Sequence, residues 1–401
     1  MTAKEFLESK KSEIIELQTL LTSHPAIAPE GGGDGEAEKS AALEKWLISK
    51  GFSDFKRYEI PDSRVTAGFR PSLVATIPGK KDDFSVWVIA HIDVVPAGDI
   101  NLWNTNPWEI TEKDGKLYGR GTEDNQQGLC SAVFAALYYI ENKIVPEHTI
   151  KLLFAADEEN GSLYGTIPLA EKGIFNKNDL VLIPDGGDPK GQTIEIAEKN
   201  LLWIKITVEG KQTHGSRPDS GANACLAACD LSVKLNALEK IFNKKDDLFE
   251  PNYSTFQPTK RLANVDSVNI IPGKDVFYMD CRILPCYTLA EILEKAEKII
   301  KEVEKEHNVK ISYEIPQKSE SPATKQNAPV AQKLAASIKK VHNTEPKFIG
   351  IGGGTVGAEF RRKGIDAVVW STLDDKAHQP NEYCKIENLC KDAQTLIDFF
   401  E

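Results

Sequence analysis

The chain has 401 residues, of which 41% are hydrophobic and 27% are charged, a composition typical of a soluble globular protein long enough for two domains. Its net charge of −11, from 49 basic and 60 acidic residues, argues against a nucleic-acid-binding protein, because such proteins usually carry a basic surface. No stretch approaches the roughly 20 consecutive apolar residues of a membrane helix, and seven scattered cysteines favour neither a disulfide framework nor a thiolate zinc site.

The first half of the chain alternates predicted helices and strands. The start is charged and then amphipathic, unlike a secretory signal, so we expect a cytoplasmic protein. Helices are predicted over residues 4–22, up to about residue 50 and over 128–141, with a glycine-rich loop at 29–35. Strands are predicted over 72–76, 86–90, 149–155 and 179–183. Their unbroken apolar runs suit strands buried on both faces of an α/β sheet.

The pattern changes after about residue 200. Strand 201–209, helix 222–238, strands 265–270 and 276–283, helix 289–306 and strand 309–315 follow one another. This β-α-β-β-α-β order is typical of a small ferredoxin-like domain. From about residue 322 the chain resumes with a helix, strand 347–351, a helix, strand 367–370 and a final helix. We therefore expect an α/β catalytic domain of residues 1–199 and 317–401, interrupted by an α+β lid of residues 200–316.

Histidine and carboxylate residues directly follow three predicted core strands. His91 and Asp93 follow strand 86–90, Glu158 and Glu159 follow strand 150–155, and Asp185 follows strand 180–183. Ligands of open α/β sheets bind beyond the carboxyl ends of the strands. We therefore expect these side chains to meet at one edge of the sheet.

Each of these residues also has a simpler interpretation. Positions 91 and 93 lie on the same side of an extended segment, so Asp93 is a candidate to orient a metal-binding imidazole; alternatively, His91 is a partly buried histidine beside a turn aspartate. Asp124, in the polar loop 119–128, is placed to bridge two cations or to cap the following helix. One of Glu158 and Glu159 would bind metal while the other takes a proton from water, although acidic pairs are usually solvated surface.

His378, just past a predicted strand, supplies a second histidine. Two imidazoles and three carboxylates without a thiolate suit zinc, manganese or cobalt. With Asp124 bridging, each of two metals would have three protein ligands and room for water, as in co-catalytic pairs roughly 3.5–4 Å apart.

Together these motifs resemble the dinuclear-zinc aminoacylases and dipeptidases, the family of carboxypeptidase G, carnosinase, acetylornithine deacetylase and succinyl-diaminopimelate desuccinylase. The resemblance covers nearly the whole chain in the family's order. It implies a mixed-sheet zinc-peptidase domain with an inserted lid. It also implies a cis peptide bond between Asp124 and Asn125. It implies that His91 and Asp185 bind one metal, that Glu159 and His378 bind the other, and that Asp124 bridges them. It further implies that Glu158 is the general base and that Asp93 orients a ligand.

The lid motif at residues 210–218 contains His214. In dimeric relatives the lid histidine reaches the partner subunit's active site and stabilises the oxyanion, a role that suits a positioned donor; alternatively, His214 is an ordinary loop histidine. The resemblance implies that Asn269 and Arg282 grip a substrate carboxylate, for which a guanidinium is well suited. It adds Arg217, Gly354 and Thr355 to the substrate-binding set and implies a homodimer through the lid.

Two other functions compete with this interpretation. Residues 352–357 satisfy Gly-x-Gly-x-x-Gly, with Asp374 about twenty residues on, as in dinucleotide-binding enzymes. We discount this because the loop lies late in an interrupted domain and explains none of the histidines and carboxylates. A non-catalytic relative should lack the base or a ligand, yet all are present. No Gly-x-Ser-x-Gly occurs, and Cys130 on an apolar helix suits the core better than a nucleophile.

The substrate class depends on Asp185. Relatives with aspartate at this position are mostly dipeptidases and aminopeptidases, whereas glutamate goes more with deacylases and carboxypeptidases. We therefore expect a dipeptidase-like enzyme that acts on small peptides, with an N-acyl amino acid deacylase, such as a desuccinylase or deacetylase, as the alternative.

Overall fold

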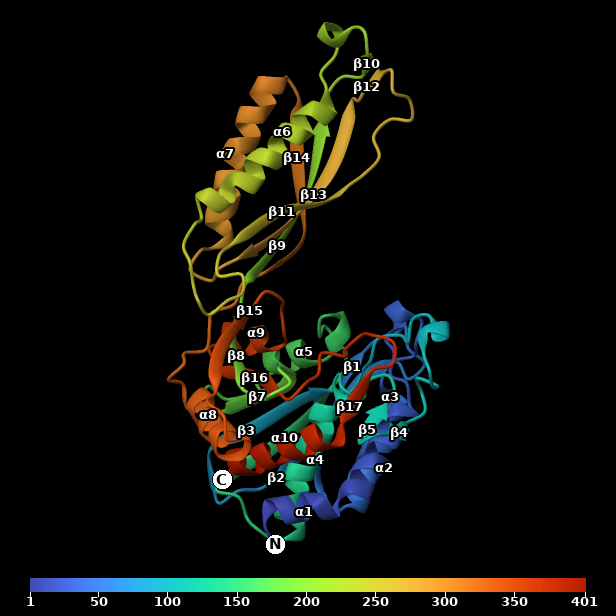
Figure 1. Cartoon of the computed structure of the whole chain (residues 1–401), viewed down its shortest axis with the longest axis vertical. Helices are drawn as coiled ribbons and strands as arrows, with labels where there is room; N and C mark the ends of the chain where they lie inside the picture. Colours follow the sequence, from blue (N-terminus) through green and yellow to red (C-terminus); the bar gives the residue numbers. More distant parts are fainter. The chain divides into compact units, whose positions relative to one another are not determined.

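The computed structural model describes all 401 residues, which divide into two compact units (Figure 1). The main unit comprises residues 1–196, 324–349 and 355–401. The inserted unit comprises residues 197–323 and 350–354. No helix in either unit is both long and apolar enough to cross a membrane.

The main unit contains a mixed sheet of eight strands in the order β1-β2-β6-β3-β7-β16-β8-β15. Strands β6, β3, β7 and β16 run parallel to one another, whereas β1, β2 and β8 pair antiparallel with their neighbours. The strands are β1 (Asp54–Pro61), β2 (Phe69–Ile77), β3 (Lys81–His91), β6 (His148–Ala155), β7 (Leu180–Gly187), β8 (Thr193–Glu198), β15 (Lys347–Ile351) and β16 (Ala367–Ser371). The expected mixed α/β sheet is confirmed.

Helices enclose this sheet and explain its apolar runs. Residues 85–91 of β3 are all buried, and Trp87 and Ile89 pack with Leu153 of β6 and Val181 of β7. Helix α4 is buried along nearly its whole length. The main helices are α1 (Ala3–Ser9), α2 (Lys11–Thr22), α3 (Ala37–Ser49), α4 (Gln126–Glu141), α5 (Thr166–Glu171), α8 (Pro329–His342), α9 (Gly357–Arg362) and α10 (Ile386–Phe400). A small sheet of β4 (Thr111–Lys113), β5 (Lys116–Tyr118) and β17 (Tyr383–Lys385) completes the unit.

The inserted unit is a four-stranded antiparallel sheet with two helices. The sheet order is β11-β13-β9-β14, and apolar residues of β9 such as Leu202 and Ile206 pack with Leu231 of α6 and Ile292 of α7. In chain order the elements are β9 (Asn200–Glu209), α6 (Ala224–Asn236), β11 (Thr255–Arg261), β13 (Lys274–Ile283), α7 (Leu289–His307) and β14 (Lys310–Ser319). A two-residue pairing of β10 (Thr213–His214) with β12 (Ile270–Ile271) lies apart from this sheet.

Two sequence predictions differ from the structure, and several elements were not predicted. The strand predicted over 265–270 is wrong: the chain there is mostly irregular, and the strand is β11, which ends at Arg261. Strand β11 lies at the sheet edge, contains Pro258 and exposes most of its side chains, so it lacks the apolar alternation of a typical strand. The helix predicted over 4–22 is two helices that meet at Lys10. Strands β1 and β8, the short strands β4, β5, β10, β12 and β17, and the short helix α5 were not predicted.

Candidate metal centre

The parallel strands β6, β3 and β7 end at the same edge of the main sheet, as the sequence predicts. His91 is the last residue of β3, Glu158 and Glu159 follow β6, and Asp185 lies near the end of β7. Two loops add the remaining predicted ligands. Asp124 lies just before α4, and His378 lies between β16 and β17.

The His91 ring is buried and held on both sides. Its Nδ1 lies 3.0 Å from the backbone oxygen of Asp93 and 3.4 Å from the Asp93 carboxylate. Its Nε2 lies 2.8 Å from Asp124 Oδ1 and 3.7 Å from Asp185 Oδ1. The ring therefore turns Nε2 toward the carboxylates, the arrangement that a metal-binding imidazole needs.

Asp93 also fixes the loop after β6. Its two carboxylate oxygens accept the backbone N–H groups of Glu158 and Glu159, each at 3.1 Å. Asp93 is almost fully buried, so these are charge-assisted bonds in a desolvated setting. One aspartate thus positions the histidine of β3 and both carboxylates that follow β6.

Asp124 lies between the two histidines. His378 Nε2 is 3.1 Å from Asp124 Oδ2 and 3.0 Å from Glu159 Oε2, while the other Asp124 oxygen faces His91. The Asp124–Asn125 peptide bond is cis, as the family resemblance implies. The backbone of His378 has a φ of +61°, and its side chain is 54% exposed, so this histidine forms the open side of the cluster.

The donor atoms fit a pair of divalent cations. Potential ligand atoms of His91, Glu158 and Asp185 all lie within 4.8 Å of one another, as do those of His91, Asp124 and Glu159. All are nitrogen or carboxylate oxygen, the set that suits zinc, manganese or cobalt. Glu158 belongs to the first group, so geometry alone allows it to act either as a ligand or as a base.

In the protein without cations, this concentration of carboxylates shifts the pKa values of the site residues. Burial and the nearby Asp185 carboxylate raise the pKa of Glu158 well above its usual range, and burial raises the pKa of Asp185 to about 6. Hydrogen bonds to Asp124 and Glu159 raise the pKa of His378 to about 10. Burial lowers the pKa of His91, but the surrounding carboxylates outweigh it and leave the pKa well above its usual range. Protons therefore compensate the excess negative charge, and metal binding would release them.

Sequence reasoning missed three residues that hold these ligands in place. Asn125 donates from Nδ2 to Asp185 Oδ1 at 2.9 Å and to the Pro184 backbone oxygen at 2.6 Å. Glu123 and Glu382 are buried carboxylates that accept backbone N–H groups. The only available signal was their position beside Asp124 and His378 in the sequence.

The predicted catalytic residue His214 and the predicted substrate-binding residues Arg217 and Asn269 gather near one end of β13 in the inserted unit. His214 is exposed on β10, and its Nδ1 lies 2.8 Å from Ser216 Oγ. The Arg217 N–H donates to the His214 backbone oxygen at 2.9 Å, and the Asn269 oxygen accepts the Gly215 N–H at 2.7 Å. A bond of 2.8 Å from the Gly210 N–H to the Gly273 oxygen ties this region to the start of β13 at Lys274.

Arg282 lies near the other end of β13. Its guanidinium binds Asp280, with Nε donating to Oδ1 at 2.8 Å, and Nη1 donates to the Gly352 oxygen at 2.8 Å. At about 3.3 Å per strand residue, the eight residues from Lys274 to Arg282 span roughly 26 Å. Within one chain, therefore, the structure does not bring Arg282 together with His214, Arg217 and Asn269.

The glycine-rich loop at residues 352–357 lacks the setting of a dinucleotide fingerprint. Strand β15 is at the edge of the sheet, where it neighbours β8, and β8 separates it from β16. Helix α9 has only six residues, so no β15-α9-β16 unit of adjacent parallel strands forms. Gly354 belongs to the inserted unit with Gly352, while Thr355 returns to the main unit, where its Oγ1 accepts the Gly357 N–H at 3.1 Å.

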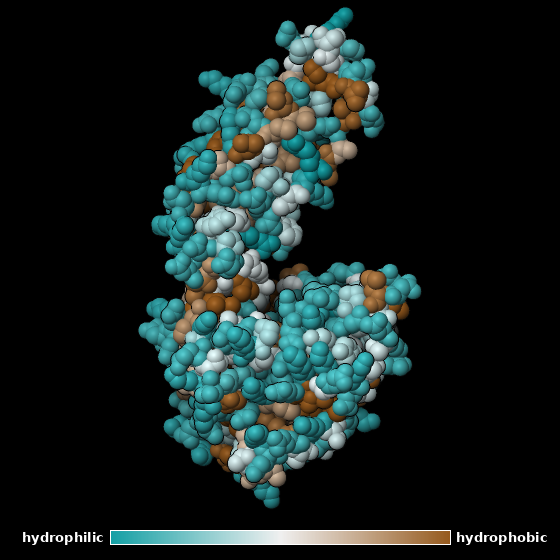
Figure 2. All heavy atoms as spheres, viewed as in Figure 1, coloured by the Kyte–Doolittle hydropathy of each residue, from teal (hydrophilic) through white to brown (hydrophobic).

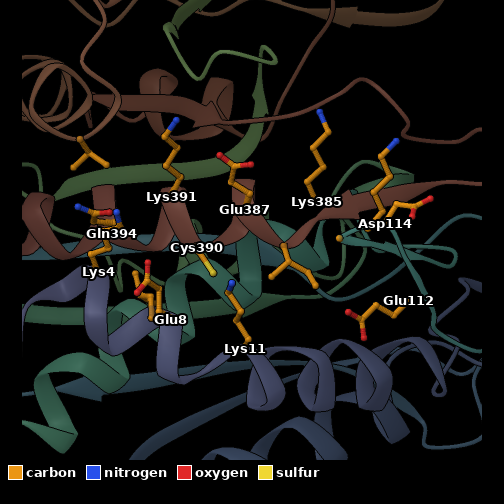
Figure 3. A pocket seen from close by; sticks show the side chains of 15 residues that line it. Lys4, Glu8, Lys11, Glu112, Asp114, Lys385, Glu387, Cys390, Lys391 and Gln394 are labelled. Atoms are coloured by element: carbon orange, nitrogen blue, oxygen red, sulfur yellow. The ribbon is translucent and has the colours of Figure 1, made fainter.

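A cleft of about 830 Å³ lies elsewhere in the main unit (Figure 3). It is bordered by α1, the β4–β5 hairpin and α10, and no predicted site residue lines it. Lysines and carboxylates of opposite charge share its rim, including Lys4, Lys11, Lys391, Glu8 and Glu387. This balance of charge selects no ligand class.

Known proteins resemble the chain over most of its length. Residues 87–401 match the model of peptidase family M20/M25/M40. An uncharacterized metallohydrolase of Methanocaldococcus jannaschii is 40% identical over 407 residues, which cover 97% of this chain and 99% of the relative. The succinyl-diaminopimelate desuccinylase of Rickettsia bellii is 30% identical over 321 residues, or 79% of this chain and 80% of that enzyme. The aminopeptidase PepT of Bacillus cereus shares the fold, with a TM-score of 0.76 and 19% identity over 97% of this chain and 98% of the neighbour.

Proposed function

Because the chain belongs to peptidase family M20/M25/M40 and is thus a metal-dependent hydrolase, we propose that it cleaves the amide bond of a small peptide at a pair of divalent cations. Zinc is the preferred metal, with manganese and cobalt as alternatives. The observation that carries the proposal is the Asp124 carboxylate, which offers one oxygen to His91 and the other to His378. That is the geometry of a bridging ligand.

Five side chains would hold the metals. His91 and Asp185 would bind one cation, Glu159 and His378 the other, and Asp124 both. When bound, the cations supply a Lewis acid and an activated water. Asp93 keeps His91 and the two glutamates in position.

Glu158 is the proposed general base. It would accept a proton from the attacking water and return it to the leaving amine. Its partly buried position and raised pKa support this role, because a carboxyl that takes up a proton readily is suited to transferring it.

His214 would complete the site of a second copy of the chain. A small peptide cannot touch both ends of β13, which lie roughly 26 Å apart at the strand rise. We propose that His214, Arg217 and Asn269 act on a substrate bound to the partner subunit, where His214 stabilises the oxyanion. Arg282, Gly354 and Thr355 form the other proposed substrate-binding set.

The surface of the inserted unit supports a homodimer. Hydrophobic side chains reach its surface (Figure 2), and on α6 Leu226 is 58% and Val233 69% exposed. With the exposed Cys229 they form one stripe at helical spacing. Strand β11 is paired on one side only, as is β14 at the opposite edge of the sheet, and an open edge can pair with another chain. We propose that the partner's inserted unit covers the β11 edge and the stripe.

A substrate panel tests the proposed function. Dipeptides and N-acyl amino acids should be assayed after loading with Zn²⁺, Mn²⁺ or Co²⁺, and we expect turnover of dipeptides. Turnover of acylated substrates alone would reject the peptidase and favour a desuccinylase-like deacylase, the alternative that the Rickettsia bellii relative supports. Chelation should abolish activity and added metal should restore it; activity that survives complete metal removal would refute the metal centre.

A further inference from the structure

Two loops of the main unit at the candidate metal centre have several backbone N–H groups that are bound by side chains and not by backbone oxygens. One is residues 119–124, which carries Asp124, and the other is residues 373–382, which carries His378. Both are irregular, and such segments are usually mobile unless their backbone groups are bound. Here two buried glutamates bind those groups.

Glu382, four residues after His378, binds the loop of Asp124. Its Oε1 accepts the N–H groups of Glu123 at 2.9 Å and Asp124 at 3.1 Å, and its Oε2 accepts the Gly121 N–H at 2.9 Å. The Arg120 guanidinium donates to the same Oε2 at 2.6 Å. The side chain is fully buried, so no water competes for these bonds.

Glu123, the residue before Asp124, binds the loop of His378 in return. Its Oε1 accepts the Asp374 N–H at 2.6 Å, and its Oε2 accepts the Lys376 N–H. Glu123 is also buried. Each loop therefore carries one predicted metal ligand and one carboxylate that holds the other loop.

We propose that Glu123 and Glu382 form a reciprocal clasp that sets the distance between Asp124 and His378 and thereby tunes the affinity of the second metal. The inference rests on the proposed function, since it concerns the cation held by Glu159, His378 and Asp124. Both are positioning residues, because neither contacts a predicted substrate or takes part in proton transfer.

The two arms of the clasp act differently. Glu123 reaches only the His378 loop, so its loss loosens one ligand of one metal. Glu382 fixes the backbone of Asp124, the shared ligand, so its loss affects both metals. Carboxylates that accept several backbone N–H groups form strong bonds, and outer partners of metal ligands commonly change metal affinity 10–100-fold.

Calorimetric titration of the metal-free protein with Zn²⁺ tests the proposal. In Glu123→Gln only one carboxyl oxygen remains for two N–H donors, so we expect the weaker of two binding steps to lose at least about tenfold in affinity while the other stays unchanged. Glu387→Gln, an exposed change on the first turn of α10, is the matched control and should bind like the wild type. Thermal unfolding of the metal-free variants identifies any that fail to fold.

A double-variant cycle separates positioning from general destabilisation. In a His378→Ala background, which retains the metal of His91 and Asp185, Glu123→Gln should have no further effect, whereas Glu382→Gln should still weaken binding. Two results would refute the clasp. One is that Glu123→Gln lowers the affinity for the remaining metal as much in the His378→Ala background as in the otherwise unchanged protein. The other is that Glu123→Gln alone changes the affinity of neither binding step. If the wild type binds no Zn²⁺ at all, the proposed function fails instead.

Discussion

Glu158 and Glu159 are adjacent in sequence but differ in their surroundings. Glu159 lies 3.0 Å from His378, whereas Glu158 is grouped with His91 and Asp185 and has a pKa raised well above its usual range. Asp93 accepts the backbone N–H of both residues and so fixes the loop from which the two side chains extend. In the proposed function, the same short loop would offer one carboxylate for metal binding and one for proton transfer.

The Glu158→Gln variant tests this division. We expect it to keep two bound metals, because the proposed ligand set is untouched, and to lose about 10²–10⁴-fold in kcat, because an amide cannot accept the proton. Metal analysis and steady-state kinetics measure the two effects. Loss of a metal together with activity would identify Glu158 as a ligand.

His342, at the end of α8, provides a pH-dependent contribution to stability and is not among the proposed metal ligands. Burial lowers its pKa to about 4, and its Nε2 lies 3.1 Å from Thr395 Oγ1. Below an unfolded-state pKa of about 6.5, the unfolded chain takes up a proton that the folded state excludes, so the free energy of unfolding falls as the pH drops from about 6.5 to 4. The ring is partly exposed, so we expect a loss of about 1–2 kcal/mol.

Comparison with His342→Gln measures this contribution. Unfolding at about pH 8 and about pH 4.5 should show the wild type losing more stability on acidification than the variant, which has no titrating ring. Equal losses in both proteins would contradict the prediction. The variant retains an amide that can bond Thr395, so packing is altered little.

The predicted ligands were accessible to sequence reasoning because each follows a strand or opens a helix. Glu123 and Glu382 were not, because their contacts join loops 259 residues apart and leave no spacing in the sequence. Their proposed function depends on backbone N–H groups, which every residue except proline possesses. The partner of a carboxylate that binds backbone N–H groups therefore cannot be recognised in the sequence by its residue type.

Among the secondary-structure elements, α4 depends on a close approach to β7. A Cβ on Gly128 would lie 2.4 Å from the Pro184 backbone oxygen, the same oxygen that accepts the Asn125 side chain. Glycine is therefore needed where the helix passes the residue before Asp185. This contact sets the position of Asp185 relative to Asp124.

Gly128→Ala should displace Pro184 and weaken both stability and metal binding. Overpacking costs about 1–3 kcal/mol, which exceeds the roughly 1 kcal/mol that alanine gains in helix propensity. Urea unfolding and Zn²⁺ titration measure the effects. Gly353→Ala, where a Cβ meets nothing within 4 Å, is the control for stability; a more stable Gly128→Ala protein would refute the close approach.

The elements that sequence reasoning predicted well are those with continuous apolar faces. The runs of β3, β6 and β7 reflect burial on both faces, whereas β11 exposes five consecutive residues and contains a proline. Strand β11 is held at the sheet edge by backbone pairing with β13, and backbone pairing leaves little trace in the pattern of side chains. The break between α1 and α2 is similar, since residues 4–22 keep helical spacing across it.

For the molecule as a whole, the separation of His214 from Arg282 along β13 bears on whether one chain or two contribute to each proposed site. If both contact one substrate, two copies of the chain must contribute to each site. A symmetric dimer supplies this automatically, because each subunit gives and receives the same groups. The proposed interface on α6 and β11 belongs to the same unit as His214.

Mixed dimers of two inactive variants test this arrangement. Glu158→Gln removes the proposed base and His214→Ala removes the proposed oxyanion donor, so each homodimer should have very low activity. In a mixed dimer, the subunit with an intact Glu158 receives His214 from its partner and regains one complete site. Random assortment makes half of the dimers mixed, so co-expression should restore about a quarter of wild-type activity.

The control pairs Glu158→Gln with His378→Ala. Both changes lie in the main unit, so no combination completes a site and the mixture should stay inactive. If His214 instead serves its own chain, the first mixture also stays inactive, because each subunit then lacks one group and its partner cannot replace it. Recovery in the first mixture alone therefore requires both that the chain dimerises and that the histidine of the inserted unit crosses to the neighbouring metal centre.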